Sequence, residues 1–289
     1  MNFFIGQVMP YITLIVFTVG LLYRLSRWGR ARIVHNITLS DNIGPTHWPK
    51  SNAEVLALIG AEAGLFRSLF RFDKSLWAGA WIMHFALLNI IGGHVVGFYT
   101  LGLQFTYIGM SAEMSENASS LLGTSFGIII LFALIYLLYR RLAVAAVKQV
   151  SVTSDILQLL LLIGIVSAGN FMRLFPAYAV HYETANSIVG GIVKLNPVAL
   201  PDNIFFTIHF FLVQVLLMIF PFSKLMHVIG MFVERNIVNR VYKDLPAGLP
   251  GINAPAENAV DILYSPSIEA RDNCPACVSA SGGVKSAGV

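Results

Sequence analysis

The sequence predicts an all-α integral membrane protein, a five-transmembrane-helix bundle with the N-terminus outside and the C-terminus in the cytoplasm. Hydrophobic residues make up 56% of the 289-residue chain and charged residues only 12%, about half their share in soluble domains. The mean hydropathy is +0.71. Five apolar stretches are long enough to cross a hydrocarbon core of ~30 Å. Lysine and arginine gather on alternate connections between these stretches.

The five stretches follow one another with polar connections between them. They cover approximately residues 4–23, 76–103, 121–139, 156–175 and 204–230. Each supplies the ~20 apolar residues that one helical crossing needs. None alternates apolar and polar residues as a barrel strand does, so a helix is the remaining way to satisfy the backbone in lipid.

The basic residues predict the orientation. They concentrate in residues 24–74, after the third stretch and after the fifth, whereas the connections 104–120 and 176–203 hold Lys194 as their single basic residue. The positive-inside rule then makes the chain a multi-pass protein of the cell (cytoplasmic) membrane with its N-terminus outside. The net charge of +4 reflects this bias and does not indicate nucleic-acid binding.

Two regions are predicted not to span. Residues 52–72 place Val55 and Ile59 near one side, which favours a helix on the cytoplasmic interface; a helix packed under the bundle fits equally well. Residues 244–289 are rich in proline, glycine, alanine and serine and cannot bury a core of their own. The expected division is a membrane domain, 1–243, and a cytoplasmic tail, 244–289, ordered by a partner.

Four histidines lie inside otherwise apolar stretches. His84 and His94 are ten residues apart in the second stretch, and His209 and His227 are 18 apart in the fifth. A histidine in a membrane helix is costly and usually functional. Imidazole is also a common axial ligand of cytochrome iron. Because the second and fifth helices run in opposite directions, His94 should lie level with His209, and His84 with His227.

The two pairs predict two b haems, each bound between two histidines as metal ligands. Eighteen helical residues are five turns, so His209 and His227 should share one face, ~27 Å apart, against ~15 Å for His84 and His94. We expect helix tilt and a kink at Pro221 to absorb the difference. No Cys-x-x-Cys-His motif is present, which excludes a c-type haem.

The residues alone leave other classes of function open. Histidines can form the proton relay of a transporter or channel, although no inverted repeat supports that interpretation. A membrane anchor for a partner enzyme is also possible, but it leaves the histidines unexplained. Cys274 and Cys277 form a lone Cys-x-x-Cys, for which free thiols are the simplest interpretation; a redox dithiol and a metal site completed by a partner are the alternatives.

Both histidine spacings, on the second and fifth of five helices, resemble the gamma subunit of respiratory nitrate reductase and its relatives. The segments 221–227 (PFSKLMH) and 169–173 (GNFMR) are also similar to that family, and the resemblance covers roughly residues 8–243. It implies two haem b groups, with menaquinone or another quinone as substrate. The chain would then be an electron-transfer subunit of a respiratory oxidoreductase complex.

Residues 65–70 (LFRSLF) resemble one branch more closely, the membrane subunits of sulfite-reduction-associated (DsrM type) and heterodisulfide-reductase-like complexes. That branch implies sulfur metabolism and a cytoplasmic iron–sulfur subunit as partner, with further membrane and periplasmic subunits. The chain departs from the nitrate reductase pattern where that family has a lysine beside the quinone, because the loop 104–120 contains no lysine.

Arg173, Lys224 and Gly93 complete the candidate site. Arg173, at the outer end of the fourth stretch, can pair with a haem propionate or reach lipid headgroups, and Lys224 beside His227 has the same two options. Gly93, next to His94, removes side-chain bulk and lets a flat ring approach, although ordinary helix packing also uses such glycines. We expect the quinone near the outer haem, bounded by Gly93 and His94.

Overall fold

The computed structural model describes residues 1–30 and 51–238, and the predicted tail with Cys274 and Cys277 lies outside these residues. Every regular element in the described part is helical. Five of its helices are long and apolar enough to cross a membrane. The predicted class is thereby confirmed: this is an all-helical, multi-pass cell membrane protein. The direction in which the helices cross stays a prediction.

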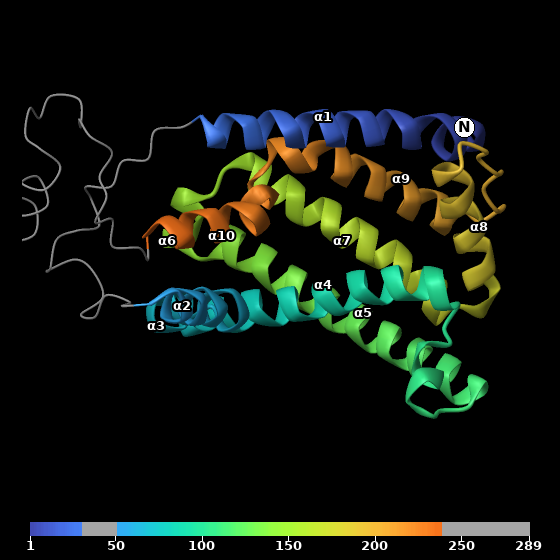
Figure 1. The fold of residues 1–289 in the computed structure, drawn as a ribbon, viewed down its shortest axis with the longest axis horizontal. Helices are drawn as coiled ribbons and strands as arrows, with labels where there is room; N and C mark the ends of the chain where they lie inside the picture. Colours follow the sequence, from blue (N-terminus) through green and yellow to red (C-terminus); the bar gives the residue numbers. More distant parts are fainter. Residues whose placement is uncertain (31–50, 239–289) are drawn as a thin grey trace, which may run out of the picture. The chain divides into compact units, whose positions relative to one another are not determined.

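The five spanning segments begin and end close to the predicted stretches (Figure 1). They are η1 (Phe4–Val8) with α1 (Met9–Gly29), α4 (Lys74–Thr100), α5 (Ala112–Ala143), α7 (Thr153–Leu174), and α9 (Ile204–Ile219) with η4 (Phe220–Phe222). The shorter elements are α2 (Asn52–Leu65), α3 (Arg67–Phe72), η2 (Gln104–Ile108), α6 (Ala145–Val150), η3 (Pro176–Tyr178), α8 (Tyr182–Val193), η5 (Lys224–Met226) and α10 (His227–Val238).

The chain forms two compact units. The first contains residues 1–30 and 62–228, and with them all five spanning segments. The described residues of the second unit are 51–61 and 229–238, which belong to α2 and α10 apart from Ser51. The predicted domain boundary, between residues 243 and 244, lies outside the described residues, so that division stays a prediction.

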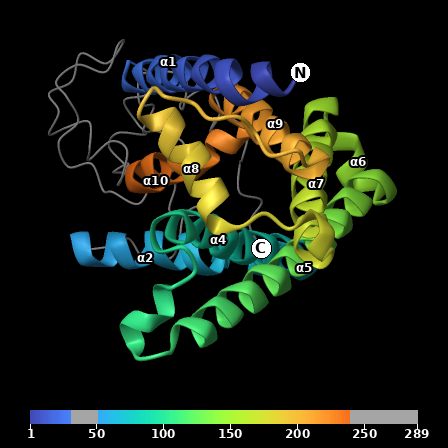
Figure 2. The same ribbon diagram turned by 90° about the vertical axis from the view of Figure 1, so that its right-hand side faces the viewer.

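Within the first unit the spanning helices pack in the order α4, α5, α7, α9 and α1. Seen from one end, they follow an arc in that order (Figure 2). Buried Ala86, Ile130 and Leu134 form the core where α4 meets α5. Gly79 lets these two helices approach closely, because a Cβ atom there would lie 2.6 Å from the ring of Tyr136.

Side-chain caps fix where several helices begin. The carboxylate of Asp73 accepts a hydrogen bond from the backbone N–H of Leu76 at 2.8 Å, at the start of α4. The hydroxyl of Ser111 accepts one from Met114 at 3.3 Å, at the start of α5. Such caps satisfy backbone donors that a helix leaves unpaired in its first turn. Helix α5 therefore begins nine residues before the predicted apolar stretch, at Ala112.

The fifth helix is broken, whereas we expected one helix with a kink. Helix α9 ends at Ile219, and two short 3-10 turns lead to α10, which begins at His227. Pro221 cannot donate a backbone hydrogen bond and its ring clashes with the preceding turn. Ser223 then adopts an extended conformation, with φ −110° and ψ 174°. His209 and His227 consequently lie on two different helices, and the assumption of five continuous turns between them is wrong.

The predicted helix over residues 52–72 is likewise two helices. Phe66 has φ 50°, a left-handed conformation that ends α2 and starts α3. In addition, the predicted connection 176–203 contains a helix of its own, α8. Tyr11 of α1 donates a hydrogen bond to the backbone oxygen of Ile192 in α8, which ties this connection to the first spanning helix.

Candidate haem site

The four histidines meet in two pairs, the ones that the depth of each residue predicts. The ring centroids of His84 and His227 are 5.7 Å apart, with the rings at 87° to each other. Those of His94 and His209 are 6.3 Å apart, and the rings are nearly parallel, at 11°. A metal ion with imidazole nitrogens ~2 Å away on both sides places the ring centres about 6 Å apart. Both separations suit one axially ligated iron.

All four imidazoles donate through Nδ1–H to a backbone carbonyl oxygen. The acceptors are Ala80 for His84 at 2.8 Å, Ile90 for His94 at 2.7 Å, Ile165 for His209 at 2.8 Å and Lys224 for His227 at 2.9 Å. Because a carbonyl only accepts, Nδ1 carries the proton and Nε2 keeps a free lone pair. Metal-ligating histidines are usually held by such a bond.

The supporting carbonyls come from different places. His84 and His94 use the residue four positions earlier in α4, as helix geometry allows. His209 uses Ile165, which belongs to the neighbouring helix α7. One turn further along α7, Gly169 makes room for this ring, because a Cβ atom there would lie 3.3 Å from its Cε1. Helix α7 therefore shapes the His94–His209 pair without supplying a ligand.

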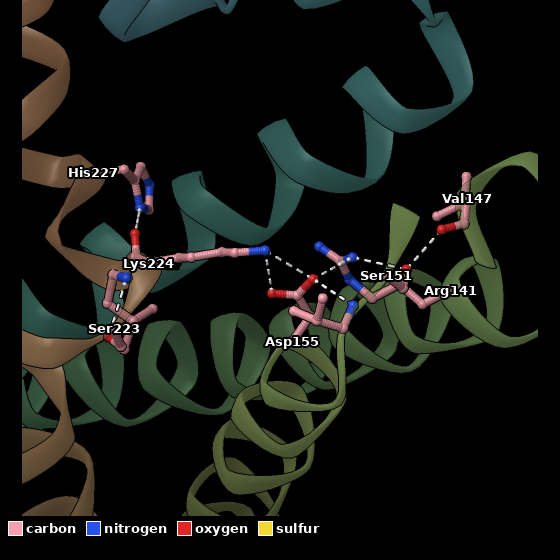
Figure 3. Close-up of polar contacts among 9 residues, drawn as sticks. Arg141, Val147, Ser151, Asp155, Ser223, Lys224 and His227 are labelled. Carbon is pink, nitrogen blue, oxygen red and sulfur yellow. Dashed lines mark hydrogen bonds and ion pairs between the residues drawn. The ribbon is translucent and has the colours of Figure 1, made fainter. Parts of the chain in front are cut away.

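His227 is held by a segment that ion pairs anchor (Figure 3). Lys224, whose backbone oxygen binds the imidazole, extends its side chain to Asp155 at the start of α7, where Nζ lies 2.8 Å from Oδ1. Arg141 of α5 lies 3.2 Å from the other carboxylate oxygen. The Asp155 side chain is only 3% exposed. Lys224 was expected to reach a propionate or the headgroups, and the structure pairs it with Asp155.

Three aromatic residues, Phe66, Trp77 and Trp81, form a corner that covers His84. The ring of Phe66 meets the imidazole edge-on, with centroids 5.1 Å apart. Two tryptophans of α4 hold the corner: the indole of Trp77 donates to the oxygen of Leu65 at 2.7 Å, and that of Trp81 donates to the oxygen of Gly64 at 2.8 Å. These bonds satisfy carbonyls that the end of α2 leaves unpaired.

The contacts of three further residues, Gly93, Arg173 and Asn170, do not by themselves define a role in cofactor binding. A Cβ atom on Gly93 would meet nothing within 4 Å, so the backbone beside His94 borders open space. Arg173 is exposed, with its guanidinium against Gly123 of α5, 2.7 Å from where a Cβ atom would sit. Asn170, one turn before Arg173, is buried and donates to the oxygen of Gly127 at 2.7 Å. The roles of Gly93 and Arg173 in cofactor binding stay predictions.

The site therefore fits haem iron by three independent features. The ring separations suit an iron between each pair, the tautomers leave Nε2 free, and the rings of His94 and His227 are exposed in the chain by itself. Together with five spanning helices, these features describe a multi-pass membrane protein whose paired histidines have the spacing that a bis-histidine haem needs.

Comparison with known proteins assigns the family. The chain belongs to the nitrate reductase gamma subunit family, whose sequence profile matches residues 67–242, more than half of the chain. The matched region begins in α3 and contains all four histidines.

Individual relatives come from two kinds of complex. The Hdr-like menaquinol oxidoreductase cytochrome b-like subunit of Archaeoglobus fulgidus is 26% identical over 265 residues, covering 81% of this chain and 79% of the relative. Its counterpart in Archaeoglobus profundus is 26% identical over 275 residues, covering 82% and 79%. The nitrate reductase gamma chain of Bacillus subtilis is 27% identical over 230 residues, covering 78% and 89%.

Sequence reasoning missed three contributors to the site. The carbonyl of Ile165 leaves no trace in a side-chain pattern. Phe66 lies in the predicted non-spanning helix over residues 52–72, and its contact with His84 depends on a backbone turn that no motif marks. Asp155 was the one with an available signal, since a carboxylate at the start of a membrane helix is rare and usually has a partner.

Proposed function

We propose that this chain is the membrane cytochrome b subunit of a respiratory redox complex, in which two bis-histidine b haems pass electrons between a membrane quinol and a cytoplasmic iron–sulfur partner. The observation that carries the proposal is the two pairs of adjacent imidazoles at two positions along α4, each imidazole with a free Nε2. A b haem bound there supplies reversible one-electron chemistry. The chain supplies ligands, their tautomers and an apolar surround.

The relatives favour menaquinol as the electron donor or acceptor. Two of them carry the name of a menaquinol oxidoreductase subunit, and their alignments cover four-fifths of this chain. The nitrate reductase gamma chain is the counterpart of another complex, at similar identity. We therefore place this chain in a multi-subunit quinol-dependent complex of the Hdr-like type, with a heterodisulfide-reductase-like iron–sulfur subunit as its cytoplasmic partner.

The quinone site is proposed beside the His94–His209 pair. The open space at Gly93 supports this placement, because a flat headgroup needs backbone without side chains. The distribution of basic residues supports an orientation with His84 and His227 toward the cytoplasm. Quinol oxidation at the outer pair would then release protons outside, while electrons cross to the cytoplasmic partner.

A proton relay accounts less well for the same geometry. Relay histidines exchange protons through hydrogen bonds with one another or with water. Here each of the four donates to a backbone carbonyl, which fixes its tautomer. A metal ligand needs a fixed tautomer, because one ring nitrogen must keep a free lone pair. A relay histidine must instead change its tautomer whenever it passes on a proton.

Haem quantification tests the proposal. The purified full-length protein should give a reduced b-type spectrum and about two haems per chain by the pyridine haemochrome assay. His181→Ala is the matched control: this histidine lies at the start of α8, outside both pairs, and its loss should leave the haem content unchanged. A well-folded wild-type protein that contains no haem would disprove the proposed function.

A further inference from the structure

We propose that Asp155 is a positioning residue for His227, acting through Lys224. The inference rests on the proposed function, and it adds a residue that no comparison assigns. Asp155 touches no histidine. Its side chain binds the side chain of Lys224, and the backbone oxygen of Lys224 binds Nδ1 of His227 (Figure 3).

The link consists of short polar contacts with a buried centre. Asp155 is 3% exposed, and its carboxylate accepts from Lys224 Nζ at 2.8 Å, Arg141 at 3.2 Å and the backbone N–H of Val152 at 3.3 Å. Lys224 is therefore held at both ends, by Asp155 at its ammonium and by His227 at its carbonyl. A carboxylate in this setting is costly unless it is paired and hydrogen-bonded, so the contacts depend on one another.

The link is needed at this pair because the helix does not provide it. Lys224 and His227 follow the break at Pro221, where Lys224 lies in the one-turn element η5. The N–H of Leu225 is capped by Ser223 rather than by a continuing helix, at 3.1 Å. A carbonyl in such a segment keeps its direction only if the residue is anchored elsewhere. Asp155 is the anchor, since α7 is a continuous helix of 22 residues.

Helix α7 then supports the ligands of α9 and α10 at both depths. Ile165 binds His209 directly, and Asp155 binds the residue that holds His227. These two positions are ten residues apart, like His84 and His94 on α4, and each interval corresponds to ~15 Å of helix. The support helix and the ligand helix thus repeat the same spacing, although α7 contributes no ligand.

The test uses the full-length protein with its haems, four single variants, the double variant Asp155→Asn/Lys224→Met, and His227→Ala to assign the signals. Asp155→Asn and Lys224→Met each break the link, and Lys224→Met does so at a side chain that is 65% exposed and tolerant of change. Lys224→Arg keeps the charge and should retain wild-type behaviour. Asp73→Asn is the matched control. Asp73 pairs at 2.6 Å with Arg140, the neighbour of Arg141 in the sequence, and Arg140 does not bind a residue whose carbonyl holds a histidine.

The readouts are the reduction potential and the electron paramagnetic resonance signal of each haem, assigned by which signal His227→Ala removes. Asp155→Asn and Lys224→Met should shift the His84–His227 haem and weaken its retention about tenfold, as loss of ligand support typically does. The other haem should be unchanged. The double variant should shift no further than either single one, because both changes break one link.

Several outcomes would overturn the inference. If Lys224→Met shifts the signal and Asp155→Asn does not, Lys224 acts directly and Asp155 positions nothing. If both haems shift together, or if Asp73→Asn has the same effect, the ion pairs only hold the fold. In each of these cases the wild type still binds two haems and the proposed function stands. A wild type without haem would instead remove the proposed function.

Discussion

The two histidine pairs reach similar ring separations by opposite routes. At the His94–His209 pair, both histidines lie on continuous helices, and the support for His209 is a backbone carbonyl of packed α7. At the His84–His227 pair, His227 begins a helix after a break, and its support is a short turn held by ion pairs. Backbone packing fixes the first pair, and charged side chains fix the second.

This difference explains why the break in the fifth segment is tolerated. An unbroken helix would separate His209 from His227 by ~27 Å, whereas His84 and His94 are ~15 Å apart along α4. Two 3-10 turns around Pro221 redirect the chain so that both rings meet their partners. Gly20 of α1 makes room for the redirected segment, because a Cβ atom there would lie 2.8 Å from Phe222 and 3.0 Å from Pro221.

The largest expected effect comes from removing a ligand, which tests whether the pairs are independent. His84→Ala and His227→Ala should each remove the same haem, and His94→Ala and His209→Ala the other, leaving one haem per chain each time. Haem content and low-temperature optical spectra measure the losses. If His84→Ala and His209→Ala gave the same spectral loss, the pairing in the structure would be wrong.

The sequence predicted the spans and the pairing because both depend on simple regularities. Apolar length marks a membrane helix, and antiparallel direction determines which histidines share a depth. Supports for the ligands depend on tertiary packing instead. Every residue type has a backbone carbonyl, so the sequence does not single out that of Ile165. The link from Asp155 to Lys224 joins positions 69 residues apart, which no local pattern connects. Pro221 predicted a bend, but the two 3-10 turns on either side of Ser223 depend on its hydroxyl, which donates to the oxygen of Phe220 and accepts from the N–H of Leu225.

The next effect concerns packing at the His94–His209 pair. Gly169→Val adds a branched side chain where even a Cβ atom would lie 3.3 Å from the His209 ring. The imidazole must move, so we expect about tenfold weaker retention of this haem and an unchanged second haem. Haem titration of each variant measures this.

Gly190→Val provides the control for that substitution. Gly190 lies in α8, and a Cβ atom there would meet nothing within 4 Å. It should keep both haems at wild-type affinity. Equal loss of both haems in Gly169→Val would mean that α7 supports the bundle as a whole rather than one pair.

The ring angles predict a spectroscopic difference between the pairs. With an iron bound, the parallel imidazole planes of His94 and His209 would donate into the same d orbital and separate it in energy from its neighbour. The perpendicular planes of His84 and His227 would leave the two orbitals nearly equal in energy. Axial ligation is one of the means by which a protein tunes haem. The ferric haem lost in His227→Ala should therefore have the larger maximum g value, measured by electron paramagnetic resonance.

The smallest expected effect comes from the ion pair of Asp73 and Arg140, and it separates fold stability from the positioning of the histidines. Asp73 caps α4 and pairs with Arg140, whose side chain is 9% exposed. The hydrogen bond from the backbone of Leu76, followed by the one from Arg140, lowers the pKa of Asp73 below its usual value. A carboxyl whose pKa is lower in the folded state stabilises the fold above its unfolded pKa, and this contribution is lost as the pH falls through the folded pKa.

Asp73→Ala should therefore lower the thermal unfolding midpoint at neutral pH, and the difference from wild type should shrink in acid. Both haem signals should keep their wild-type potentials, because the Asp73 side chain contacts no histidine and no residue whose carbonyl holds one. Thermal unfolding between neutral pH and pH 3, followed by redox titration, measures both. If Asp73→Ala shifted the His84–His227 haem as strongly as Asp155→Asn, the two ion pairs would act as one clamp, and charge at this end of the bundle would matter more than its route to His227.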